Sequence, residues 1–132
     1  MELATRPTAS EHLVIELALE PESASHARTA ISRLRPHAHD SSFDDVILLA
    51  SELVCDALAT RPRPDDARLT LEADVVEGST WVMASFDGLA LRLSADKPKP
   101  TEPGWGVYLV QTLASRWGAG RSSDSTYVWF EA

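Results

Sequence analysis

The chain has 132 residues, of which 44% are hydrophobic and 24% charged, proportions that are ordinary for a soluble globular protein. Its formal net charge is −8, and an acidic surface repels phosphates, which argues against nucleic acid as a partner. No stretch approaches the roughly 18 consecutive apolar residues of a membrane span, and the first ten residues lack an apolar signal segment. We therefore expect one cytoplasmic domain over residues 1–132, with neither nucleic acid nor membrane as a partner.

The first part of the chain predicts a strand followed by two helices. Leucine and isoleucine alternate with other residues over 12–19, which indicates a strand. Ser23 or Ser25 then provides an N-cap for a helix that runs to about Leu34. A second serine cap, followed by acidic residues in the first turn (41–45), opens another helix. That helix is expected to end before the proline-rich segment that follows it.

The rest of the chain predicts a hairpin, a helix and a final strand. Alternation over 68–75 and over 80–86 indicates two strands joined by a turn at 77–79. A helical pattern extends over 107–117 until glycines terminate it, and 126–131 reads as the last strand. Helices that are segregated from hairpin-linked strands predict an α+β sandwich, in which helices cover one face of a mixed, mostly antiparallel sheet.

Two carboxylates, Glu52 and Asp56, lie one turn apart on the second helix. Apolar residues recur around them at three- and four-residue spacing, so the helix packs on a core and the two acids lie at its edge. The simplest interpretation is a solvated acidic edge. The chemical alternative is a general base and a hard oxygen ligand for magnesium, one helical turn apart. Cys55, the only cysteine, is expected to pack in this helix as a small hydrophobe.

Two further motifs follow the carboxylate pair along the chain. Asp87-Gly88 ends a predicted strand, and a carboxylate in that place accepts a hydrogen bond from an exocyclic amine such as that of adenine. Gly104 and Gly106 open a predicted helix, where glycines allow phosphate to approach unpaired backbone amides. Each motif alone is usually a turn or a helix boundary. Together with Glu52 they are the parts of a nucleotide site.

The order of these motifs resembles the histidine-kinase-like (GHKL) ATPases, specifically the anti-sigma-factor serine kinases. Residues 52–57 (ELVCDA) are similar to the family's ELVTNA box, and Asp87-Gly88 to its D-x-G box. Residues 104–110 (GWGVYLV) resemble its GRGLxLV box. The ending, with 113–118 (LASRWG) and 128–131 (VWFE), is similar to the family's LADRWG…TVWFE. The likeness runs from about residue 10 to the C-terminus.

The resemblance implies a Bergerat-type GHKL sandwich that uses ATP and magnesium. It implies that Glu52 is the general base for phosphorylation of a serine on a partner protein, that Asp56 is the magnesium ligand and that Asp87 holds the adenine. The partners it implies are a sigma factor and an anti-anti-sigma factor. The nucleotide-binding residues it implies are Asp56, Asp87, Gly88, Gly104, Gly106 and Thr126.

Several positions depart from the family pattern. Asp56 stands where the family has asparagine, and 89–91 (LAL) stands in place of the expected second glycine. Trp105 is bulky within the glycine box, and the family's threonine aligns with Tyr127, one residue after Thr126. Two functions therefore stay open: an ATP-dependent serine kinase and anti-sigma factor, or a degenerate binding module that works without nucleotide. The sequence also leaves open whether the chain forms a homodimer.

Overall fold

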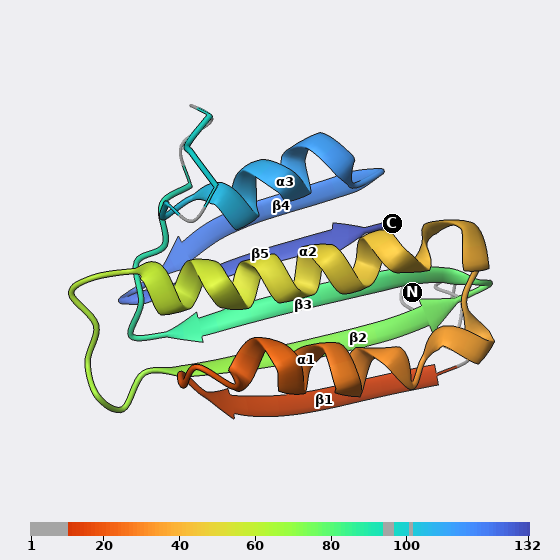
Figure 1. The fold of residues 1–132 in the computed structure, drawn as a ribbon, viewed down its shortest axis with the longest axis horizontal. Coiled ribbons are helices and arrows are strands. Elements are labelled where there is room, and N and C mark those ends of the chain that lie inside the picture. Colours follow the sequence, from red (N-terminus) through yellow and green to blue (C-terminus); the bar gives the residue numbers. More distant parts are fainter. Residues whose placement is uncertain (1–10, 94–96, 101) are drawn as a thin grey trace, which may run out of the picture.

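The computed structural model describes residues 11–93, 97–100 and 102–132. They form a five-stranded sheet with α-helices on one of its faces (Figure 1). None of the described helices is long and apolar enough to cross a membrane. The elements in chain order are β1 (Glu11–Ala18), α1 (Ser23–Ser32), the short 3-10 helix η2 (Arg35–His37), α2 (Asp40–Ala59), β2 (Arg68–Val76), β3 (Ser79–Asp87), α3 (Trp105–Leu113), β4 (Arg116–Ser122) and β5 (Ser125–Glu131).

The sheet has the strand order β1-β2-β3-β5-β4. Each neighbouring pair is antiparallel, so the described sheet is antiparallel rather than mixed. Two hairpins, β2 with β3 and β4 with β5, account for this arrangement, because tight turns reverse the chain direction. The predicted α+β sandwich with helices on one face is confirmed (Figure 1).

Strand β4 and the short helix η2 are the described elements that the sequence pattern did not predict. Helix α3 ends at Leu113, and the chain from Arg116 onward pairs with β5. Gly118 and Gly120, expected only to terminate the helix, are strand residues that make room for aromatic rings of β5. A Cβ atom on Gly120 would lie 2.5 Å from the hydroxyl of Tyr127, and one on Gly118 would clash with the indole of Trp129. These glycines therefore let two large rings lie flat on β4.

The two predicted serine caps are wrong. The N-cap residues of α1 and α2 are Glu22 and His39, and neither has a side-chain capping bond. The hydroxyl of Ser23 instead donates to the carbonyl of Ala18 and accepts from the amide of Glu20 at 3.0 Å. Ser23 thus stabilises the turn between β1 and α1, a tertiary role that a capping pattern does not reveal.

The core lies between the helices and the sheet, with α2 at its centre, packed against both α1 and α3. Its largest fully buried side chains include Phe43 and Leu53 of α2 and Phe86 and Phe130 of the sheet. Alternate strand residues point to the opposite side, which we call the open face because no described helix covers it (Figure 1). The open face includes Glu72, Asp74, Trp81, Met83, Tyr127 and Trp129.

Candidate functional site

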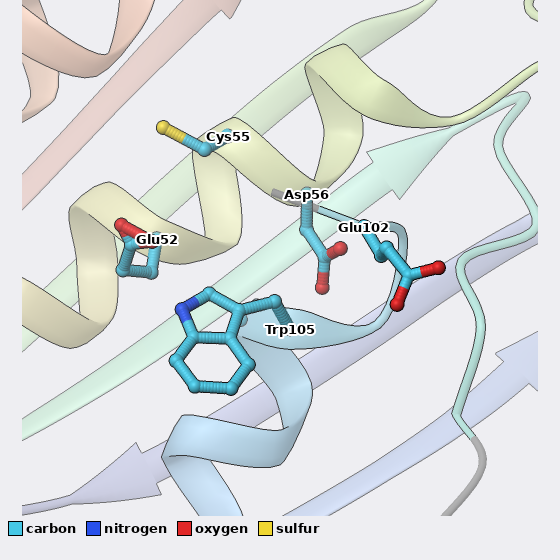
Figure 2. A pocket seen from close by; sticks show the side chains of 6 residues that line it. Glu52, Cys55, Asp56, Glu102 and Trp105 are labelled. Atoms are coloured by element: carbon cyan, nitrogen blue, oxygen red, sulfur yellow. The ribbon is translucent and has the colours of Figure 1, made fainter. Parts of the chain in front are cut away.

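A pocket of about 230 Å³ lies between α2 and the beginning of α3. Figure 2 shows carboxylates from α2 and from the loop that precedes α3 around it, together with the ring of Trp105. Three acids in one small pocket make its interior electronegative. The lining residues are Glu52, Cys55, Asp56, Glu102, Trp105 and Gly106.

Asp56 is the central residue of this pocket. Its side chain is buried, with 3% of the residue exposed. One carboxylate oxygen accepts a hydrogen bond from the amide of Gly104 at 2.5 Å, and the other accepts from the amide of Val107 at 3.2 Å. Amides in the first turn of a helix have no intrahelical partner. Asp56 of α2 therefore caps α3, and the interpretation of this acid as a solvated edge residue is wrong.

Two features of its environment shift the pKa of Asp56 in opposite directions. Burial raises the pKa of its carboxyl to about 6, and the neighbouring carboxylate of Glu52 adds to the increase. The amides of Gly104, Val107 and Gly106 oppose the change because they stabilise the carboxylate. At neutral pH the group is therefore mostly ionised, and its negative charge lies at the positive end of the α3 dipole.

The two glycines of the predicted phosphate loop have structural tasks. Gly104, the N-cap of α3, has φ +98°, a left-handed conformation that glycine adopts without strain. Gly106 lies directly against α2: a Cβ atom there would be 2.5 Å from the carbonyl oxygen of Glu52. Gly106 therefore allows α3 to approach α2 closely, and Gly104 provides the backbone conformation from which α3 begins, so that Asp56 reaches the amides of α3.

Glu52 and Cys55 lie on the solvent side of the same helix. Glu52 is partly exposed and lines the pocket one turn before Asp56, as its spacing predicted. Cys55 is exposed, so the expectation that it packs as a small hydrophobe is wrong. Partial burial of the thiol and the nearby Glu52 carboxylate raise the pKa of Cys55. Cys55 therefore holds its proton at neutral pH and is a weak nucleophile there.

Thr126 lies elsewhere in the core and is fully engaged by the chain. Its hydroxyl donates to the carbonyl of Leu89 at 2.7 Å and accepts from the amide of Leu91 at 3.2 Å. The guanidinium of Arg121 also donates to it at 3.1 Å. A hydroxyl has one donor and two acceptor sites, so Thr126 is saturated. Leu89 and Leu91 are themselves buried, so this loop fills part of the helix-covered side of the sheet.

Asp87 and Gly88 are not among the residues that line the pocket of Glu52 and Asp56. Asp87 ends β3 on the open face, where Ser125 donates a hydrogen bond to its carboxylate at 3.4 Å. It lines a shallow hollow of about 430 Å³ beside the turn between β4 and β5. Strand alternation explains this position, because Asp87 is one residue after the buried Phe86.

Of the predicted site residues, the structure therefore brings four together: Glu52, Asp56, Gly104 and Gly106. Sequence reasoning missed two groups. Glu102, which lines the pocket, lies in a proline-rich segment without a recognisable pattern. Arg121 lies on the unpredicted strand β4, and its guanidinium donates a 2.6 Å hydrogen bond to the carbonyl of Leu91. Among the described residues, no group of three or more histidines, cysteines and acids is placed to hold a metal ion.

Comparisons with known proteins bear on the fold. No protein-family profile matches the chain, and no curated protein matches it in sequence. Twelve chains of solved structures match it. One is the crystal structure of the RsbU and RsbW domains of Rv1364c from Mycobacterium tuberculosis, with a TM-score of 0.70 and 16% sequence identity. The match covers 92% of this chain and 32% of that chain, so this chain spans about a third of its neighbour's length. It shares the fold of the RsbW domain of that neighbour.

Proposed function

We propose that this protein is a regulatory protein-binding domain that controls transcription by partner switching and does so without nucleotide. The partners proposed are a sigma factor and an anti-anti-sigma factor. The observation that carries the nucleotide-free part of the proposal is the capping of α3 by Asp56: the chain's own carboxylate occupies the amides at which an anionic ligand would bind. The regulatory part is supported by the fold shared with the RsbW domain of the structural neighbour.

A phosphate entering this place would meet two obstacles. The amides of Gly104 and Val107 already donate to Asp56. In addition, a second negative charge about 4 Å from the carboxylate costs about 1 kcal/mol in water and about 4 kcal/mol at intermediate dielectric. Glu52 and Glu102 in the same pocket add to this repulsion. Binding of a polyphosphate would therefore require Asp56 to leave α3 or to become protonated.

The residues implied for the adenine end of a nucleotide do not converge on this pocket. Asp87 lies on the open face, and the hydroxyl of Thr126 is hydrogen-bonded to Leu89, Leu91 and Arg121. Both oxygens of Asp56 are likewise engaged by backbone amides. With their oxygens engaged in this way, Asp56, Asp87 and Thr126 do not fit magnesium and ATP.

A second candidate is the ATP-dependent serine kinase. It is favoured by the position of Glu52, which lines the pocket with Asp56 and Gly106 and reaches solvent there. In that function Glu52 is the general base, and Asp56 must exchange the amides of α3 for a metal ion. The two functions thus differ in whether the carboxylate of Asp56 stays hydrogen-bonded to the amides of α3.

Exposed apolar side chains support a protein-binding function. Val14, Leu48, Leu113, Trp117 and Tyr127 are each at least 37% exposed. They are distributed over helices and strands on both sides of the molecule. Of these, Trp117 and Tyr127 carry the argument, because tryptophan and tyrosine are enriched at protein interfaces.

Calorimetric titration with ATP and magnesium tests the nucleotide part of the proposal. We expect no saturable heat for the natural chain at millimolar ATP. The Asp56→Asn variant is the matched comparison, because it keeps the shape of the side chain and removes the charge. Saturable binding to the natural chain that Asp87→Asn abolishes would overturn the proposal and favour the kinase.

Co-purification tests the partner part. The tagged chain is mixed with each sigma factor and anti-anti-sigma factor of the same genome, in the presence and absence of ATP. We expect at least one complex whose yield is unaffected by ATP. A complex that forms only with ATP, or the absence of any complex across the panel, contradicts the proposal.

A further inference from the structure

The register of the sheet arranges the side chains of the open face in rows across the strands. Antiparallel partners lie directly opposite one another, so each row can be read from the pairing. One row consists of His12, Asp74, Trp81, Glu131 and Arg116. The next row consists of Val14, Glu72, Met83, Trp129 and Gly118.

A second pocket, of about 270 Å³, lies where these two rows meet, and we call it the indole pocket. The rings of Trp81 and Trp129 stack with their centroids 5.8 Å apart and their planes at 20°. Trp129 lies over Gly118, where a side chain on the glycine would clash with its indole. Trp129 therefore packs against both Trp81 and Gly118. The indole pocket is lined by Glu72, Asp74, Trp81, Val82, Met83 and Trp129.

The walls of the indole pocket combine two features that attract a cation. Glu72 and Asp74 supply carboxylates whose side chains are 50% and 22% exposed, so both reach the solvent. The faces of the two indoles carry negative electrostatic potential. The chain already contains an example: the guanidinium of Arg116 lies 5.0 Å from the ring centroid of Trp81. Arg116 also pairs with Glu131 at 3.6 Å, and it is not among the residues that line the pocket.

His12 is the neighbouring titratable group. Its imidazole contacts the carboxylate of Asp74 and lies 3.8 Å from that of Glu72. The hydrogen bond to Asp74 raises the pKa of His12. Protonated His12 neutralises part of the acidic wall, so the wall carries its full negative charge only when the imidazole is neutral.

We propose that the indole pocket receives an arginine side chain of a protein partner. The planar guanidinium can stack on an indole face while its N–H groups pair with a carboxylate, a combination that lysine does not offer. The net charge of −8 draws a basic segment toward the protein over longer distances. This inference rests on the proposed protein-binding function, to which it adds a surface and a partner chemistry.

The test is a titration of the full chain, followed by NMR, with a short peptide that contains one arginine. The matched control peptide contains citrulline, which keeps the shape and removes the charge. The titration is run at alkaline pH, where His12 is neutral. The four tryptophans give four indole signals. We expect those of Trp81 and Trp129 to shift saturably with the arginine peptide, while those of Trp105 and Trp117 stay in place.

Three variants test whether the peptide binds in the indole pocket. Glu72→Gln should weaken peptide binding about two- to fivefold, as expected for a partly exposed charge pair. Glu16→Gln is the control, since Glu16 lies on the open face but outside the pocket. Met83→Lys should weaken binding further, because it puts a cation of the chain's own into the pocket. Equal shifts with citrulline, or equal affinity of all three variants, would overturn the inference.

Two other results separate the inference from the function on which it rests. Indole shifts of Trp81 and Trp129 that depend on protein concentration without peptide would show that a second copy occupies the face, and would overturn the inference. If Met83→Lys still binds the sigma or anti-anti-sigma factor at full yield, the indole pocket is not the docking site, and the proposed function stands without it.

Discussion

The two sides of the sheet use their polar groups differently. On the helix-covered side, Asp56 and Thr126 are buried and hydrogen-bonded to the chain's own groups. On the open face, Glu72 and Asp74 reach solvent beside two stacked indoles. The comparison shows that residues in a motif typical of a ligand site can instead form hydrogen bonds within the protein. Solvent-exposed groups that belong to no such motif remain accessible to a partner.

This difference has an energetic basis. A buried polar group costs free energy unless it is hydrogen-bonded, so a buried carboxylate or hydroxyl takes the nearest partner that the fold supplies. For Asp56 that partner is the N-terminus of α3, and for Thr126 it is the loop after β3. Groups on the open face can be satisfied by water, and they exchange water for a ligand at a lower cost.

The largest effect is expected where α3 touches α2. Gly106→Leu places a side chain against the carbonyl of Glu52 and should lower the free energy of unfolding by about 3 kcal/mol. Urea unfolding followed by circular dichroism measures it. Gln111→Ala, in the same helix, is the control and should change stability little. An unchanged unfolding midpoint in Gly106→Leu would contradict the close α2–α3 contact.

Stability as a function of pH tests Asp56. Its carboxyl has an ordinary pKa of 3.8 and a folded value of about 6, so the folded state binds the proton more tightly. Its contribution to stability is therefore full below the ordinary value and is lost as pH rises through the folded one. At about 1.36 kcal/mol per pKa unit, the loss amounts to about 3 kcal/mol.

The Asp56→Asn variant has no such proton and should lack this part of the pH dependence. Urea unfolding of both chains at a series of pH values gives the difference directly, because contributions of other groups cancel. Parallel curves for the two chains would mean that Asp56 is not buried against α3, and would reopen the site to an anionic ligand.

Thr126 should have a smaller effect. Thr126→Val keeps the shape but leaves the carbonyl of Leu89 and the amide of Leu91 without their partner, at a cost of about 2 kcal/mol. Hydrogen exchange at the amide of Leu91 should become faster. Ser125→Ala, on the opposite face, is the control. Equal exchange rates in both variants would show that Thr126 is free for a ligand.

The smallest effect is expected on the open face. Arg116→Ala removes a guanidinium that stacks on Trp81 and pairs with Glu131, and it should cost about 0.5 kcal/mol because the side chain is largely exposed. A double-mutant cycle with Glu131→Gln measures the coupling, which salt should reduce. A coupling above about 2 kcal/mol would indicate a rigid network rather than a solvent-accessible surface.

Much of the fold follows from local pattern. The alternation over β1, β2 and β3 and the helical spacing of α2 predicted these elements to within a few residues, because one buried face imposes its period on the sequence. Strand β4 was not predictable in this way, since the need for its alternate glycines becomes visible only when the rings of Tyr127 and Trp129 are placed against them. The serine caps failed for a related reason: Ser23 finds partners in the preceding turn.

The same distinction between local pattern and tertiary packing applies to the candidate site. By itself the sequence determined that Glu52 and Asp56 share a helix face and that glycines open α3, because these are consequences of helical period and backbone freedom. Only the tertiary structure decided that Asp56 reaches the amides of α3, that Thr126 is saturated and that Asp87 belongs to the open face. Each of these depends on which segment packs against which, and burial then makes every polar group take the partner it finds there.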